Sequence, residues 1–160
     1  MKTVKYKGEH KELYVLSDTH IGHPNADMKL LQKHLDMIRD TGAPWVHLGD
    51  WVDAISADDR RFNIDDARMS VVESYLDAEE LFNPIIPSCV GLLRGNHGTS
   101  WSKTEGDMIE VLARRWGVPY LGYTGFVLFF VGNKSYKIFM HHGAGAVSYT
   151  HLTLQTTPYV

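Results

Sequence analysis

The chain has 160 residues and a formal net charge of −3, with 16 Lys and Arg against 19 Asp and Glu. This length suits one domain, and the charge argues against a protein that binds nucleic acid or anionic membranes through overall basicity. A single cysteine, Cys89, excludes an internal disulfide framework. We expect a soluble, cytoplasmic protein without a membrane partner, because no apolar stretch reaches membrane-spanning length and the amino terminus has no signal-peptide core.

Apolar runs and helix-period patterns alternate along the chain. The first ten residues are polar, and we expect them to be a frayed lead-in. Buried strands are predicted over residues 13–16, 45–48 and 90–93. Amphipathic helices are predicted over residues 28–38, about 64–82 and 108–116. A hairpin follows, with strands over residues 126–131 and 136–140. This order predicts an α/β domain in which helices cover a sheet.

Four polar clusters directly follow predicted strands. They are Asp18-Thr19-His20, Gly49-Asp50-Trp51-Val52-Asp53, Gly95-Asn96-His97 and His141-His142-Gly143. Ligand crevices of open α/β sheets lie beyond the carboxyl ends of the strands, so we expect these clusters to converge at one edge. Carboxylate, amide and imidazole donors without a thiolate suit manganese, iron or zinc better than calcium. The clusters therefore predict a centre for two divalent cations.

In this order, the motifs Asp-x-His, Gly-Asp-x-x-Asp, Gly-Asn-His and a strand-terminal His-Gly resemble the calcineurin-like metallophosphoesterase superfamily, in its small bacterial and phage form. The resemblance covers residues 18 to 143 and implies a layered β-sheet sandwich flanked by helices. It also implies a metal-dependent phosphoester hydrolase, in which two cations activate a hydroxide that attacks a phosphodiester, a phosphomonoester or a nucleotide-type substrate. Manganese is the expected metal, with iron, zinc and nickel as alternatives.

The resemblance assigns roles to individual positions. It implies five metal ligands, which are Asp18, His20, Asp50, Asn96 and His142. Asp50 would bridge the two cations. His142 is preferred to His141 because the superfamily pairs its histidine with the following glycine, and His141 would then point to the opposite face of the strand.

The resemblance also implies a catalytic pair. His97 would stabilise or protonate the leaving oxygen, and Asp53 would orient its imidazole. Asp53 could instead cap the following helix. Arg94 either contacts phosphate or braces the loop. The remaining histidines are expected to be solvated or structural, with one of them, His23, also a candidate substrate contact; they are His10, His23, His34 and His47.

Two departures from the superfamily pattern bear on these expectations. Gly98 stands where an acidic residue usually follows Gly-Asn-His, and no Gly-His-x-His motif closes the chain. Residues 146–160 resemble the translation of a transposon-end sequencing adaptor, so we expect a partial domain over residues 1–145 and a tail that is not native. Two alternatives to an active hydrolase remain open, a non-catalytic binding or accessory domain and a truncated fragment that lacks turnover.

Overall fold

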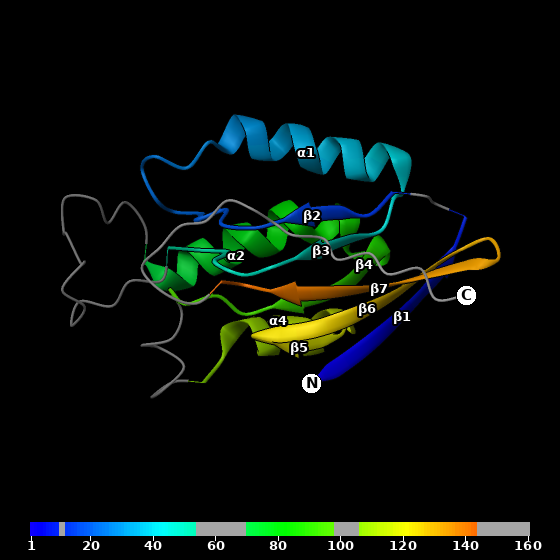
Figure 1. Ribbon diagram of the computed structural model, residues 1–160. Coiled ribbons are helices and arrows are strands. Elements are labelled where there is room, and N and C mark those ends of the chain that lie inside the picture. Colours follow the sequence, from blue (N-terminus) through cyan, green and yellow to red (C-terminus); the bar gives the residue numbers. More distant parts are fainter. Residues whose placement is uncertain (10–11, 54–69, 98–105, 144–160) are drawn as a thin grey trace.

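The structure is a computed structural model of the chain, and it describes residues 1–9, 12–53, 70–97 and 106–143. Within these residues the fold is mixed α/β, with two sheets and three α-helices (Figure 1). The interpretation of residues 146–160, the domain boundary at residue 145 and the expectations for His10 and Gly98 all fall outside the described residues.

The larger sheet is entirely parallel and has the strand order β2-β3-β4-β5. Its strands are β2 (Tyr14–Leu16), β3 (Trp45–His47), β4 (Cys89–Leu93) and β5 (Tyr120–Gly122). The first three confirm the strands predicted at these places. The sequence analysis missed β5, because three residues between Pro119 and the turn that follows are too few to show a period.

The smaller sheet has the strand order β1-β6-β7, with β1 parallel to β6 and β6 antiparallel to β7. Its strands are β1 (Lys2–Gly8), β6 (Thr124–Val131) and β7 (Lys134–His141). The expectation of a frayed amino terminus was wrong, because β1 pairs with β6 along its whole length. Its inward side chains, Val4 and Tyr6, pack between the two sheets, while lysines on its other face lower its apparent hydrophobicity.

The helices begin and end at local sequence signals. They are α1 (Met28–Thr41), α2 (Val71–Phe82) and α4 (Met108–Trp116), and the short 3₁₀ helix η1 (Asn83–Ser88) follows α2. Ser70 and Glu73 form a capping box at the start of α2, so this helix begins at Val71, and residues 64–69 of the predicted helix lie outside the described residues. No helix in the described residues is both long enough and apolar enough to cross a bilayer.

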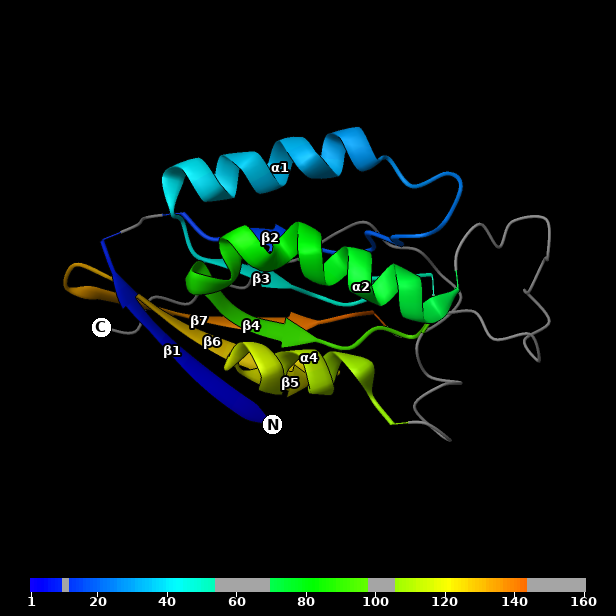
Figure 2. The same ribbon diagram turned by 180° about the vertical axis from the view of Figure 1, so that it is seen from behind.

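The elements form three layers. The helices lie on one face of the larger sheet and the smaller sheet lies on the other, as the two opposite views show (Figures 1 and 2). The core between helices and sheet includes Trp45, Trp51, Phe82 and Ile38, and the core between the two sheets includes Val46, Leu93, Val127 and Met140. The central strands β3 and β4 are almost entirely buried, and their apolar runs are continuous apart from His47 at the end of β3.

Candidate metal centre

The chain segments that leave β2 and β3 remain hydrogen-bonded to each other beyond the ends of these strands. The N–H of Asp18 donates to the carbonyl of Gly49 over 3.0 Å, and the N–H of His20 donates to the carbonyl of Asp50 over 3.1 Å. A further bridge pairs Ile21 with Val52. This continued parallel pairing carries the first two polar clusters to the same edge of the sheet.

The segment after β4 packs directly against Asp50. A methyl group built at Gly95 would lie 1.9 Å from Oδ1 of Asp50 and 2.2 Å from its backbone nitrogen, so only glycine fits there. The backbone N–H of His97 donates to the same Oδ1 over 2.9 Å. The third polar cluster therefore lies against the second through a glycine and a backbone hydrogen bond.

Three residues of the predicted site have a left-handed backbone. Among the described residues, Asp18 (φ 54°), His20 (φ 42°) and Asp50 (φ 51°) are the non-glycine residues with positive φ. Such conformations cost free energy in a non-glycine residue and are found preferentially at functional sites. The turns after β2 and β3 are thus held in backbone conformations of higher free energy, and these conformations set the positions of the Asp18, His20 and Asp50 side chains.

Asp50 lies at the centre of the cluster. Its Oδ2 is 3.2 Å from Nε2 of His142, 3.9 Å from Nε2 of His97 and 4.0 Å from Nε2 of His20. The same Nε2 of His20 lies 3.9 Å from Oδ1 of Asp18. Four strand ends, those of β2, β3, β4 and β7, therefore supply side chains around one buried carboxylate, which is 5% exposed.

The buried carboxylate and the imidazole of His142 shift each other's pKa. Burial acts to raise the pKa of Asp50, but hydrogen bonds from His142 and from the N–H of His97 outweigh it and bring this pKa to about 2. The hydrogen bond to Asp50 raises the pKa of His142 above its ordinary value. Asp50 is therefore ionised throughout the physiological range, as a metal ligand must be.

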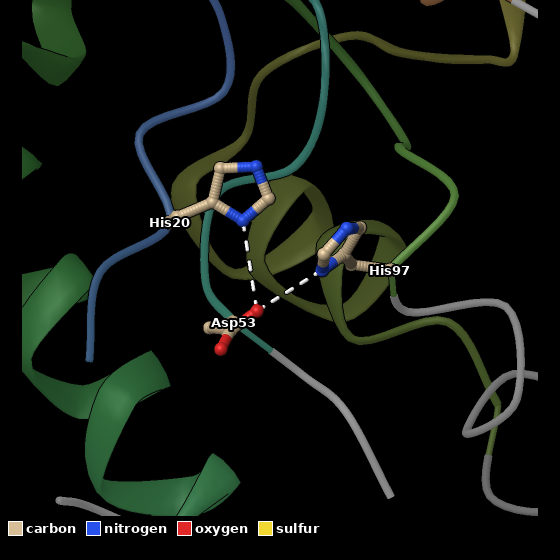
Figure 3. A group of neighbouring side chains, drawn as sticks. All are labelled: His20, Asp53 and His97. Carbon is tan, nitrogen blue, oxygen red and sulfur yellow. Dashed lines mark hydrogen bonds and ion pairs between the residues drawn. The ribbon is translucent and has the colours of Figure 1, made fainter. Parts of the chain in front are cut away.

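Asp53 lies between two imidazoles (Figure 3). Its Oδ1 is 3.0 Å from Nδ1 of His97 and 3.7 Å from Nδ1 of His20. Only the contact with His97 was expected. Because both Nδ1 atoms face Asp53, both Nε2 atoms are left facing Asp50. Burial and the neighbouring His97 lower the pKa of His20, so its imidazole is held in the neutral form that binds metals.

Among the residues that the structure describes, two sets of side chains have donor atoms close enough to share a cation. In each set the donor atoms lie within 4.8 Å of one another, and the sets are Asp18, His20 and Asp50, and His20, Asp53 and His97. The donors are carboxylate oxygens and imidazole nitrogens, which fit the first-row divalent cations expected from the sequence. The first set matches the predicted ligands. The second contains the pair predicted to be catalytic, so it offers a competing role for His97.

The other two predicted ligands, Asn96 and His142, lie at the same edge but belong to neither of these sets. Asn96 is exposed and stands between Gly95 and His97, which both contact Asp50. His142 is buried against Asp50, whereas His141 stacks on Phe139 on the other face of β7. The structure thus brings His142 to the cluster and turns His141 away from it.

An open cleft of about 410 Å³ lies beside the cluster. It is lined by residues of the segment after β2 and by the pair predicted to be catalytic, namely Asp18, Thr19, His20, His23, Asn25, Ala26, Asp27, Asp53 and His97. Nδ1 of His23 accepts a hydrogen bond from the N–H of Asn25, so its protonated Nε2 is the atom available to a bound molecule. The expectation that His23 contacts substrate stays a prediction.

The sequence analysis did not single out His47 as part of the site. It is fully buried in β3, its Nδ1 accepts from the N–H of Gly49, and its Nε2 lies 3.2 Å from Oγ1 of Thr19. The hydroxyl of Thr19 donates in turn to the carbonyl of Trp51. This network links the turns that carry Asp18 and Asp50. The sequence feature that could have indicated this role is a histidine with apolar neighbours on both sides, at the end of β3.

Arg94 contacts two neighbouring side chains, Asp107 and Tyr123. Its guanidinium lies 3.3 Å from Oδ2 of Asp107 and 4.4 Å above the centre of the Tyr123 ring. Asp107 also accepts a hydrogen bond from the hydroxyl of Tyr120 and caps α4. These contacts support the structural interpretation of Arg94, and a contact with phosphate stays a prediction.

Comparisons of this chain with protein-family models, with curated proteins and with solved structures found no match.

Proposed function

We propose that the chain is a metal-dependent phosphoester hydrolase of the calcineurin-like metallophosphoesterase kind. The observation that carries this proposal is the convergence of carboxylates and imidazoles from four strand ends around Asp50. Each motif is weak alone, but together they place a buried carboxylate of lowered pKa within 4.0 Å of three imidazole Nε2 atoms, an arrangement that supports cation binding.

The ligands divide into two sets that share Asp50. Asp18 and His20 would hold one cation with Asp50, and Asn96 and His142 would hold the other with Asp50. Manganese is the proposed metal, with iron, zinc and nickel as alternatives for the same nitrogen and oxygen donors. When bound, such a pair of cations activates water and neutralises charge on a phosphoryl group.

His97 would supply the proton of the reaction. The contact of its Nδ1 with Oδ1 of Asp53, at 3.0 Å, would fix the orientation of the imidazole. A proton held at Nε2, which faces the centre of the cluster, is the one that can pass to the leaving oxygen. Asp53 would act through His97 as a positioning residue, and its contact with His20 would orient a ligand in the same way.

The substrate would enter through the cleft beside His20, Asp53 and His97. This cleft is open, which suits a phosphate ester whose alcohol groups extend beyond the site. We propose a phosphodiester, phosphomonoester or nucleotide-type substrate, including a phosphodiester of a nucleic acid.

The test combines cation titration with hydrolysis of two model esters, bis(p-nitrophenyl) phosphate and p-nitrophenyl phosphate. We expect Mn²⁺-dependent hydrolysis by the wild-type chain and loss of both Mn²⁺ binding and hydrolysis in Asp50→Asn. The matched control is Asp77→Asn, which removes an exposed carboxylate from α2. Tight Mn²⁺ binding without hydrolysis of either ester would favour a non-catalytic binding domain, and absence of Mn²⁺ binding would overturn the proposal.

A further inference from the structure

Positive charge is concentrated on the smaller sheet. Its three strands contain five lysines and none of the chain's 19 acidic residues, although the whole chain has a net charge of −3. The five are Lys2, Lys5, Lys7, Lys134 and Lys137. The net charge of the whole chain does not show this basic region, because all the acidic residues lie outside the three strands.

The outer face of this sheet joins lysines to aromatic rings. Side chains alternate along each strand, and Val4, Tyr6, Val127, Ile138 and Met140 are directed toward the larger sheet. The opposite face therefore presents the alternate residues, which are Thr3, Lys5, Lys7, Thr124, Phe126, Leu128, Phe130, Ser135, Lys137, Phe139 and His141. We call these eleven residues the outer face.

The register of the strands sets the pattern on the outer face. Phe126 pairs with Phe139 across β6 and β7, and their ring centres are 5.3 Å apart. The next pair along is Leu128 with Lys137, and Lys5 of β1 lies on the other side of Leu128. A cross-strand row with two aromatic rings, Phe126 and Phe139, is thus followed along the strands by a row with two lysines, Lys5 and Lys137.

The described structure leaves this face uncovered. The helices lie beyond the larger sheet, on the far side from β1, β6 and β7 (Figures 1 and 2). Phe139 is 52% exposed at the edge strand β7, and its ring forms a row with Phe126 and His141. Lys137 lies 4.2 Å above the ring of Phe126, which leaves Phe139 as the more accessible aromatic surface.

We propose that the outer face binds single-stranded nucleic acid. Proteins bind single strands through aromatic side chains that stack on bases and basic side chains that contact phosphates, on a surface that tolerates any sequence. Phe139 and its aromatic neighbours would stack on bases, and Lys5, Lys7 and Lys137 would contact the phosphates. The absence of carboxylates from these strands removes the repulsion that a polyanion would otherwise meet.

The aromatic row leads to the candidate metal centre. It ends at His141, and the next residue, His142, contacts Asp50. A strand bound along the row would therefore reach the edge of the molecule that carries the cluster. Delivery of a phosphodiester to that cluster rests on the proposed function, whereas binding to the outer face does not.

The experiment measures binding by fluorescence anisotropy, with a labelled single strand of thymidylates at low salt and in excess EDTA. EDTA separates the two proposals, because binding to the outer face needs no metal. We expect binding that weakens with salt. The change Phe139→Leu should weaken it at least about fivefold, because a base loses its stacking partner, while Phe139→Tyr should restore it.

Two double variants test the lysines. Lys5→Ala with Lys7→Ala should lower the slope of log Kd against log salt by about 1 to 1.5, which is the effect of losing two phosphate contacts to a single strand. The matched control, Lys29→Ala with Lys33→Ala, removes two exposed lysines from α1 and should leave the slope unchanged.

Four results would overturn the proposal. They are absence of binding by the wild-type chain, equal binding by the Phe139→Leu and wild-type chains, preferential binding to phosphatidylserine vesicles, and a dimer in sedimentation that Phe139→Leu dissociates. The last two would assign the outer face to a membrane and to a second copy of the chain, respectively.

Discussion

Nδ1 of His97 lies 3.0 Å from Oδ1 of Asp53, although 44 positions separate the two residues in the chain. The contact exists because the segments after β3 and β4 meet at the same edge of a parallel sheet. It leaves Nε2 of His97 facing Asp50, at a position from which this nitrogen could either donate a proton or bind a metal. The geometry is compatible with either role, and the two roles differ in what happens when His97 is removed.

Replacement of His97 by Ala tests the catalytic role. We expect kcat for bis(p-nitrophenyl) phosphate to fall by about 10² to 10⁴, the usual contribution of a general acid, with the bound Mn²⁺ unchanged. Asp53→Asn should lower kcat by about 10 to 100, because the imidazole loses its orientation. Metal content is measured by mass spectrometry on the same samples. Loss of Mn²⁺ from His97→Ala would instead assign His97 to the set of ligands with His20 and Asp53.

Replacement of Gly95 by Ala tests the close approach of the segment after β4 to Asp50. The added methyl would overlap the carboxylate and the backbone of Asp50, so the two segments must separate. We expect a loss of about 1–3 kcal/mol in the free energy of unfolding, together with weaker Mn²⁺ binding. Urea denaturation and cation titration measure these effects.

Gly91→Ala in β4 is the control for Gly95→Ala, because its nearest neighbour would be a methyl of the Leu121 side chain at 3.0 Å and not a residue of the cluster. A Gly95→Ala chain as stable as Gly91→Ala, with wild-type Mn²⁺ affinity, would contradict the packing of the segment after β4 against Asp50.

The Asp50 and His142 pair predicts how the stability of the metal-free chain depends on pH. The pKa of Asp50 is lowered from 3.8 to about 2, so its contribution of about 2 kcal/mol is present above about pH 4 and is lost as the pH falls toward 2. The pKa of His142 is raised above 6.5, so its contribution is present below pH 6.5 and is lost as the pH rises through the raised value.

The measurement for this pair compares urea denaturation of wild type and His142→Gln at several pH values. The difference in the free energy of unfolding should be greatest between about pH 4 and about pH 6.5 and should shrink on both sides. His34→Gln on α1 is the control and should show no such maximum. A flat difference across this range would show that the pair is not formed in solution.

The buried imidazole of His47 should remain neutral below the usual pKa of histidine. Burial lowers its pKa well below 6.5, and its hydrogen bonds place the proton on Nε2, because Nδ1 accepts from Gly49. Ring ¹⁵N chemical shifts should report this neutral tautomer unchanged from about pH 7.5 to about pH 5.5, where an exposed histidine becomes protonated. Titration of His47 within this range would contradict the buried network with Thr19.

Local signals in the sequence identified most of the described elements. The strands β2, β3 and β4 follow from short apolar runs, and α1 and α4 follow from helix-period patterns between a capping aspartate and a glycine. These features depend on neighbouring residues, and so they can be read from the sequence. The strand β1 was not identified from the sequence, because its lysines, Val4 and Tyr6 form a strand through pairing with β6, which is distant in the sequence.

The sequence by itself determined which residues follow the strands, and therefore which side chains can reach a common edge. The tertiary structure decided how they meet there. It placed Asp50 at the centre, turned His142 rather than His141 toward it, and set Asp53 between two imidazoles rather than beside one. These contacts join residues from separate strands, and their distances depend on the register of the sheet and on glycine packing at Gly95, which no local pattern encodes.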